Sequence, residues 1–327
     1  MKVKMKVQES LIRLFLTLAS TVIFGTGVMQ AAPANLSLIV SASPGTGLDI
    51  LARTLSQQFS IKGNYTTVVE NKAGASGNIA ADHVTRAKPD GATLLVVGTT
   101  FATNAAVNPN LPFDTVKDFV PVALLGTGTL CLVVPSSSTA NTLADFLQMA
   151  KTSTKGVNYA SPGNGTPQHL AMELLKFEAG LNLFHVPFKG SAGAVNDVAA
   201  GHVSAMIAPV HTVMPLVKAD KLKILAVLSS ERAAQMPQVP TFKEQGLPKV
   251  QVDIWYGLMA PKGTSPQVIQ SLNQEVNLVL KNPEIAANLA KQGIDAGGGT
   301  PQLMADTLSA ELKRWPPVVK AAQIKAD

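Results

Sequence analysis

The sequence predicts an α/β fold built from two lobes. Its 327 residues exceed the usual size of one compact domain. From residue 36 onward, short β-rich runs alternate with amphipathic segments of helix length, which is typical of parallel α/β units. Hydrophobic residues make up 46% of the chain and charged residues 15%, a composition that can supply two hydrophobic cores.

The first set of elements alternates strands and helices. We expect strands at 36–42, 66–69 and 93–97, one helix that begins at 49 and another over 78–88. The apolar residues of the first helix recur at helical spacing, at Ile50, Leu51, Leu55 and Phe59. Pro89-Asp90-Gly91 is typical of a turn and ends the second helix.

A second set repeats the alternation. We expect strands at 130–134, 156–160, 184–187, 203–207, 224–228 and 254–260, and helices at 142–151, 167–179, 266–280 and 301–320. Thr142 and Asp145 have the spacing of a capping box, and Pro167 suits the first turn of a helix. We expect the chain to cross between lobes near 126–130 and 250–253. One lobe then contains 33–128 and 252–327, and the other contains 129–251.

The first 32 residues are typical of a secretory signal peptide. Basic residues precede an apolar run at 14–28, and the small residues Ala31 and Ala32 follow it before Pro33. The alternative is an uncleaved anchor, although the run is shorter than the ~20 residues of a membrane span. We expect cleavage after Ala31 or Ala32 and a periplasmic protein that is not embedded in the membrane. No cysteine for lipid attachment lies near this junction.

Charge and cysteine content exclude several classes of function. The segment 1–32 carries four basic residues and one acidic residue, so its removal lowers the net charge from +6 to +3. No basic cluster remains and aromatic residues are only 5%, which argues against nucleic-acid binding. The single cysteine, Cys131, lies in an apolar run and is expected to be a buried strand residue; the alternative is a reactive thiol.

Catalytic and metal motifs are missing from the sequence. The histidines are scattered and form no His-Glu-x-x-His pair, and the chain has no Gly-x-Ser-x-Gly and no Walker-type motif. In Gly45-Thr46-Gly47, which opens a helix after a strand, Asp49 would place a negative charge where a dinucleotide phosphate sits. We expect no cofactor, no metal and no enzymatic activity. The enzyme alternative, a hydrolase or isomerase acting on a small acid, would pair Asp49, Glu70 or Asp253 with His169.

Four loops combine glycine with hydroxyl or amide side chains where a helix is expected to begin. Glycine lets a ligand approach the backbone closely, and the free N–H groups of a helix start favour an anion. Hydroxyls of Thr99, Thr100 and Ser191 would add directional hydrogen bonds. Each loop alone is also compatible with a simple helix cap, but together they predict an anion site. The loops lie at 43–49, 73–78, 161–166 and 189–191.

In these loops and in further short motifs, the chain resembles the substrate-binding proteins of tripartite tricarboxylate transporters, the Bug or TctC type. The motifs run in the order of that family from about residue 36 to the C-terminus. They include Pro44-Gly45-Thr46-Gly47-Leu48-Asp49, Glu70-Asn71-Lys72-Ala73-Gly74-Ala75-Ser76-Gly77-Asn78, Lys88-Pro89-Asp90-Gly91, Leu111-Pro112-Phe113-Asp114, Ala160-Ser161-Pro162-Gly163-Asn164-Gly165-Thr166, His185-Val186-Pro187-Phe188-Lys189-Gly190-Ser191 and Trp255-Tyr256-Gly257.

The resemblance implies a two-lobed periplasmic-binding-protein fold, similar to type II, whose lobes close on an organic carboxylate in the cleft between them. It also implies a receptor role, with transporter subunits in the membrane as partners. Asp49 is expected either to face the ligand or to cap its helix and order the loop, and His169 either to face the ligand or to pack structurally. The ligand-binding residues that it implies are Gly45, Thr46, Gly47, Leu48, Asp49, Thr100, Ala160, Ser161, Gly163, Asn164, Gly165, Thr166, His169, Ser191, Ala208 and Pro209.

Two departures from the family pattern bear on the ligand. Thr46 and Leu48 replace a glycine and a hydroxyl residue of the usual first loop, and Leu48 adds an apolar wall. The segment Met206-Ile207-Ala208-Pro209 lacks the acidic residue that would suit a ligand ammonium. We therefore expect a less polar or aromatic carboxylate and weak binding of amino acids. We expect a monomer. The alternative role is a ligand-sensing partner of a signalling protein.

Overall fold

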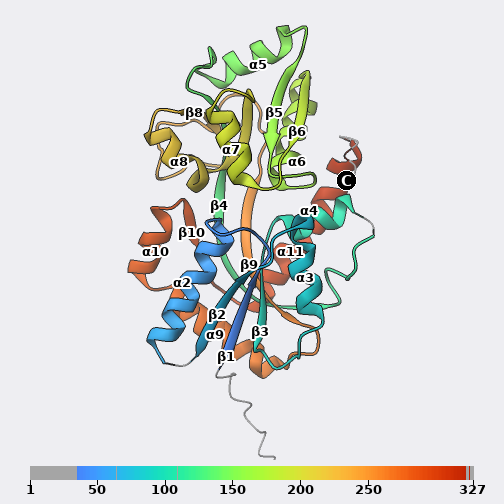
Figure 1. Ribbon diagram of the computed structural model, residues 1–327, viewed down its shortest axis with the longest axis vertical. Helices are drawn as coiled ribbons and strands as arrows, with labels where there is room; N and C mark the ends of the chain where they lie inside the picture. The colour runs from blue at the N-terminus through green and yellow to red at the C-terminus, as the bar shows by residue number, and fades with distance from the viewer. Residues whose placement is uncertain (1–34, 64, 109, 322–323, 325–327) are drawn as a thin grey trace, which may run out of the picture. The chain divides into compact units, whose positions relative to one another are not determined.

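The computed structural model describes residues 35–63, 65–108, 110–321 and 324. The predicted signal peptide, 1–32, lies outside these residues. Figure 1 shows helices packed around strands along the described chain. The mixed α/β architecture confirms the predicted fold class.

The strands form one continuous path of hydrogen-bonded neighbours in the order β2-β1-β3-β9-β4-β7-β5-β6, and β8 and β10 each pair with β4. The strands β1, β2 and β3 are parallel to one another, and so are β5, β6 and β7. The bounds are β1 Asn35–Val40, β2 Thr66–Asn71, β3 Thr93–Gly98, β4 Phe119–Pro135, β5 Val157–Ser161, β6 Leu183–Pro187, β7 Ala205–Pro209, β8 Leu222–Val227, β9 Asp253–Pro261 and β10 Ile294–Ala296.

Local capping signals fix several helices. Thr142 and Asp145 form the predicted capping box at the start of α5, and Thr166 caps α6, which has Pro167 in its first turn. The bounds are α2 Gly47–Ile61, the short 3₁₀ helix η1 Ala75–Gly77, α3 Asn78–Thr85, α4 Thr100–Val107, α5 Leu143–Thr152, α6 Pro167–Ala179, α7 Ser191–Ala199, α8 Val210–Lys218, α9 Pro266–Leu280, α10 Pro283–Ala290 and α11 Pro301–Ala321.

The strand β4 is much longer than the predicted segment 130–134. Its first part pairs with β9 up to Thr129, and its last part pairs with β7 and β8 from Leu130 onward. The register with β9 shifts twice, around Pro121 and before Gly126. These irregularities interrupt the alternation of side chains that would identify the first part as a strand. Figure 1 shows β4 and β9 running side by side.

Alternate residues of the strands enter different cores. In β1, Leu36, Leu38 and Val40 face one hydrophobic cluster with α2 and α9, whereas Ile39 faces another with α3, α4 and α11. In β4, Leu130 and Leu132 share the first cluster, whereas Cys131 and Val133 join a third cluster with α7 and α8. The strands β1 and β4 thus bury side chains on both of their faces.

Candidate functional site

The predicted ligand-binding residues lie near the carboxyl ends of the parallel strands. The strands β1, β2 and β3 lead into the starts of α2, η1 with α3, and α4. In the same way, β5, β6 and β7 lead into the starts of α6, α7 and α8. In α/β folds, ligands bind at such carboxyl ends, where helix N-termini offer N–H groups to anions.

The first loop is ordered around the carboxylate of Asp49, which is only 4% exposed. This carboxylate accepts hydrogen bonds from the Gly45 N–H at 2.9 Å, from Arg53 Nε at 3.0 Å and from Asn71 Nδ2 at 2.9 Å. Burial alone would raise the pKa of Asp49, but these hydrogen bonds outweigh burial and hold the pKa below its ordinary value. Asp49 therefore orders the loop, and the side chain of Thr46 helps by donating to Ser43 O at 2.9 Å.

Several contacts link this loop with two others that are distant in the sequence. The backbone of Gly77 packs against Ser41, because a Cβ at Gly77 would lie 3.1 Å from Ser41 Cβ. Ser76 Oγ donates to Asn164 O at 3.4 Å, and Thr103 Oγ1 donates to Gly165 O at 2.7 Å. The loop 74–78 thus contacts both the loop 41–49 and the loop 161–166, and the loop 161–166 is also bonded to α4.

In the loop 161–166, side chains hold the backbone in place. The Gly163 N–H donates to Ser161 Oγ at 3.1 Å, and the Gly165 N–H donates to His169 Nδ1 at 3.2 Å. Thr166 Oγ1 donates to Gly163 O at 2.8 Å while it caps α6. Each of these polar side chains therefore has a structural partner in the backbone of this loop.

Two aromatic rings behind this loop belong to residues that were not predicted as ligand contacts. His185 stacks on His169 with centroids 3.9 Å apart, and Tyr159 stacks on His185 at 5.0 Å. Ser161 Oγ lies 2.6 Å from His185 Nε2. Burial, with the nearby charge of Lys176, lowers the pKa of His169 to about 4, so its imidazole is neutral near pH 7. His185 begins the motif 185–191, which follows in the next strand, β6. However, no sequence pattern indicates that rings from β5, α6 and β6 will stack on one another.

The other predicted residues lie on three further elements. Thr100 begins α4, and the preceding Thr99 Oγ1 accepts a hydrogen bond from the Trp255 N–H at 2.9 Å. Ser191 begins α7, and its neighbour Gly190 donates to Pro162 O at 2.9 Å, which ties it to the loop 161–166. Ala208 and Pro209 end β7 and pair with Cys131 and Leu130 of β4. Leu48 packs against Gly98, where a Cβ would lie 3.6 Å from its Cδ2.

Tyr256, on β9, lies directly against the first loop. A Cβ at Gly47 would lie 2.5 Å from Tyr256 Oη, and one at Gly128 would lie 2.9 Å from the same oxygen. The tyrosine is 5% exposed, and its hydroxyl has no hydrogen-bond partner among the described residues. In the sequence, Tyr256 stands out only as part of the motif Trp255-Tyr256-Gly257. Its contact with Gly47 could not be predicted, because it joins segments more than 200 residues apart.

Two of the three acids of the enzyme alternative are engaged elsewhere. Asp49 is paired with Arg53, and Glu70 lies 3.2 Å from Lys72. His169 instead bonds Gly165 and stacks on His185. Within the described ranges, no group of three or more His, Cys, Asp or Glu is arranged to hold a metal ion. The same ranges contain no helix with the length and apolar character that crossing a bilayer requires.

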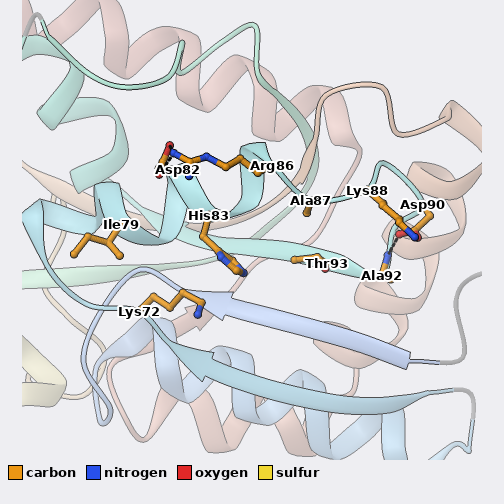
Figure 2. Close-up of a pocket in the computed structure, with 10 residues that line it drawn as sticks. All are labelled: Lys72, Ile79, Asp82, His83, Arg86, Ala87, Lys88, Asp90, Ala92 and Thr93. Carbon is orange, nitrogen blue, oxygen red and sulfur yellow. Dashed lines mark hydrogen bonds and ion pairs between the residues drawn. The ribbon is translucent and has the colours of Figure 1, made fainter.

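A cavity of about 640 Å³ lies away from the predicted site residues, along α3 and the start of β3. Figure 2 shows His83 and Lys72 approaching it from α3 and from the end of β2. Asp82 partly offsets its basic side chains, because it pairs with Arg86 at 2.6 Å. None of the predicted ligand-binding residues lines this cavity.

Comparisons with known proteins agree with this arrangement. Residues 51–324 match the family model of the tripartite tricarboxylate transporter family receptor. The protein BugT of Bordetella pertussis is 32% identical over 89% of this chain and 90% of its own length. A solved R. palustris protein with adipate shares 32% identity with a TM-score of 0.85, over 89% of this chain and 98% of that one. MatC from Rhodopseudomonas palustris, solved with malate, shares 30% identity with a TM-score of 0.81, over 87% and 98%.

Proposed function

The chain belongs to the tripartite tricarboxylate transporter receptor family. We propose that it captures a small organic carboxylate for a membrane transporter. The family is one of substrate-binding receptors. One observation supports the proposal most strongly. The loops 41–49, 74–78 and 161–166, which begin three helices or precede them, are joined by hydrogen bonds and packing although they are far apart in the sequence.

In this proposal, the solute carboxylate is held by backbone N–H groups at helix starts and by a few hydroxyls. The binding residues are those expected from the sequence, from Gly45 to Asp49, from Ala160 to Thr166, with Thr100, His169, Ser191, Ala208 and Pro209. Asp49, which is paired with Arg53, acts by ordering the first loop. Two lobes, 33–128 with 252–327 and 129–251, close on the solute and exclude water from it.

The solute is a carboxylate of low polarity. Leu48 places an apolar side chain beside Gly98, and the end of β7 offers Ala208 and Pro209 where an acid would bind an ammonium group. The similar proteins solved with adipate and malate support a carboxylate. Amino acids are expected to bind weakly because their ammonium group would lose its hydration without gaining an acidic partner.

We further propose that the chain is exported and acts as a monomer in the periplasm. Amino-terminal sequencing of protein purified after expression of the full chain should give Ala32 or Pro33 as the first residue. A purified protein that still begins at Met1 would contradict the signal peptide and favour the uncleaved anchor.

Binding is tested by thermal unfolding of the purified protein with adipate, malate, benzoate, glutamate and the neutral diamide of adipate. A solute that binds only the folded state stabilises it by about 2.7 kcal/mol at a hundredfold excess over Kd, which raises Tm by a few degrees in a chain of this size. We expect a rise with at least one of the three simple carboxylates and none with the diamide. A rise with glutamate alone, or with none of the acids, would contradict the proposed ligand class.

A matched pair of variants on one strand tests the place of binding. Thr100→Val alters the start of α4, beyond the carboxyl end of β3, whereas Thr93→Val alters the opposite end of the same strand. Both side chains are half-buried, so the two changes cost similar stability. Thr100→Val is expected to weaken carboxylate binding in calorimetric titration, and Thr93→Val is expected to leave it unchanged. If the two variants bound the carboxylate with equal affinity, the solute would not bind at the start of α4.

A further inference from the structure

The hydroxyl of Tyr256 is buried without a hydrogen-bond partner among the described residues. Its side chain projects from β9, where Tyr256 is paired with Gly98 of β3 and Gly126 of β4. Buried polar groups in proteins are nearly always hydrogen-bonded, so such a hydroxyl calls for a physical explanation. Burial raises the pKa of Tyr256, so the phenol keeps its proton and remains a donor.

This hydroxyl lies against the first turn of α2. Its oxygen would be 2.5 Å from a Cβ at Gly47, the first residue of that helix, and 2.9 Å from a Cβ at Gly128. Glycine at both positions makes room for the phenol. Oη is therefore directed at a helix start of the candidate site, and no described group there accepts its proton.

The same helix start offers further donors. The first bond of helical type runs from the Ile50 N–H to Thr46 O at 2.9 Å. The N–H groups of Gly47, Leu48 and Asp49 precede it, so they have no acceptor within the helix. The oxygens of Asp49 accept from Gly45, Arg53 and Asn71 instead. Arg53 offsets the charge of Asp49, so the first turn combines several donors with little net negative charge.

We propose that Tyr256 is a ligand-binding residue whose hydroxyl donates a hydrogen bond to the carboxylate of the solute at the start of α2. This proposal rests on the proposed function and adds to it a specific donor. A phenol O–H and backbone N–H groups donate most strongly to a charged acceptor, and none of them supplies the negative charge that would stabilise an ammonium. The hydroxyl thus contributes to the affinity for a carboxylate.

The other two tyrosines of the chain provide matched controls. Tyr159 is also buried, but its hydroxyl donates to Glu173 Oε1 at 2.6 Å. Tyr65 packs against Phe59 near the far end of α2, with ring centroids 5.3 Å apart. Removal of each hydroxyl by substitution with Phe changes one oxygen and leaves the ring in place. Tyr159→Phe is the control for stability, and Tyr65→Phe is the control for affinity.

The test measures Tm without ligand and Kd for adipate and malate by calorimetry. Tyr256→Phe should unfold at the same temperature as the wild type or at a higher one, because it removes an unpartnered hydroxyl. It should bind roughly ten- to 150-fold more weakly, the loss expected for one hydrogen bond to a charged group. Tyr159→Phe should unfold at a lower temperature, and Tyr65→Phe should bind as the wild type does.

Two outcomes would overturn the proposal: a Tm of Tyr256→Phe lowered like that of Tyr159→Phe, or an unchanged Kd. If the wild type binds neither adipate nor malate, the proposed choice of solute fails, and the Tm of Tyr256→Phe still decides about the hydroxyl. A lowered Tm then reveals a structural partner and overturns the role, whereas an unchanged or raised Tm supports a hydroxyl left free for a ligand.

Discussion

The imidazole of His169 accepts a hydrogen bond from the Gly165 N–H at 3.2 Å, and so a residue of α6 fixes the loop that precedes its own helix. Such an acceptor requires an unprotonated Nδ1. Burial of the ring and the charge of Lys176 also disfavour the protonated imidazole. The shape of the loop 161–166 thus depends on a neutral imidazole.

We predict that this residue makes the protein less stable in mild acid. The pKa of His169 is lowered from 6.5 to about 4 in the folded state, so below pH 6.5 the unfolded chain binds a proton that the folded chain does not. Stability therefore falls between pH 6.5 and 4, by up to about 3 kcal/mol for this group. Urea unfolding at several pH values should show a flatter dependence for His169→Asn, which keeps an acceptor near the Nδ1 position.

His211 contributes a second part of the same dependence, because burial lowers its pKa to about 4 as well. The control is His202→Asn, since His202 is exposed and lies at the surface beside Asp197. That variant should keep the full dependence on pH. If His169→Asn retained it too, the folded protein would have to bind a proton at His169, contrary to the hydrogen bond with Gly165.

Asp49→Asn should destabilise the protein by about 1–3 kcal/mol at pH 7, because it removes a buried charged acceptor from Gly45, Arg53 and Asn71. The pKa of Asp49 is lowered in the folded state, so its contribution is present above the unfolded value near 3.8 and is lost as the pH falls through the lower folded value. The stabilities of the two proteins should therefore begin to converge only below about pH 3.8. Arg53→Gln, on a side chain 56% exposed, should cost less than about 1 kcal/mol. A larger effect of Arg53→Gln than of Asp49→Asn would contradict this account.

Gly47→Ala should be more destabilising than Gly45→Ala. At Gly47 the added Cβ would lie 2.5 Å from Tyr256 Oη and 2.6 Å from Cζ, so the ring or the helix must move, at a cost of about 1–3 kcal/mol or more. At Gly45 no atom lies within 4 Å, and only the positive φ of 79° is unfavourable, at about 1 kcal/mol. Chemical unfolding measures both. Adding Tyr256→Phe to Gly47→Ala should not restore stability, since Cζ remains; a full rescue would show that only the hydroxyl is in the way.

Cys131 should be unreactive toward a thiol reagent in the folded protein. Its side chain on β4 is fully buried in the hydrophobic cluster with α7 and α8, and burial raises its pKa. One thiol should react after unfolding in guanidinium, and the native rate should follow the rate of global opening. Rapid reaction of the native protein would restore the alternative of a reactive thiol.

Elements with local signals were predicted well from the sequence. The bounds of α6 and α9 agree with the predictions at both ends, because Thr166-Pro167 and Ser265-Pro266 mark their starts. The helices α4, α8 and α10 were not predicted, and of α7 only the start near Ser191 was expected. α4 lacks a clear amphipathic pattern, α8 contains Pro215, and α10 has only 8 residues. The first part of β4 was missed because its pairing with β9 depends on residues more than 120 positions away.

Some features of the candidate site could likewise be predicted from the sequence, and others could not. Loops at helix starts could be recognised because glycine, hydroxyl and amide residues follow a strand within a few positions. The role of Asp49 in ordering its loop was one of two expectations, and its hydrogen bonds support it. The stack of Tyr159, His169 and His185 and the approach of Tyr256 to Gly47 could not be foreseen, since each depends on how distant strands are placed side by side.

The position of β9 in the sheet determines when the chain can finish folding. This strand lies between β3 and β4, but it is made of residues 253–261. A chain that emerges from a ribosome or a membrane pore amino end first presents β3 about 150 residues before its neighbour arrives. Until then the edge of β3 is open to pairing with other chains. We expect chains cut short before residue 253 to be prone to aggregation and proteolysis, because this edge then stays unpaired.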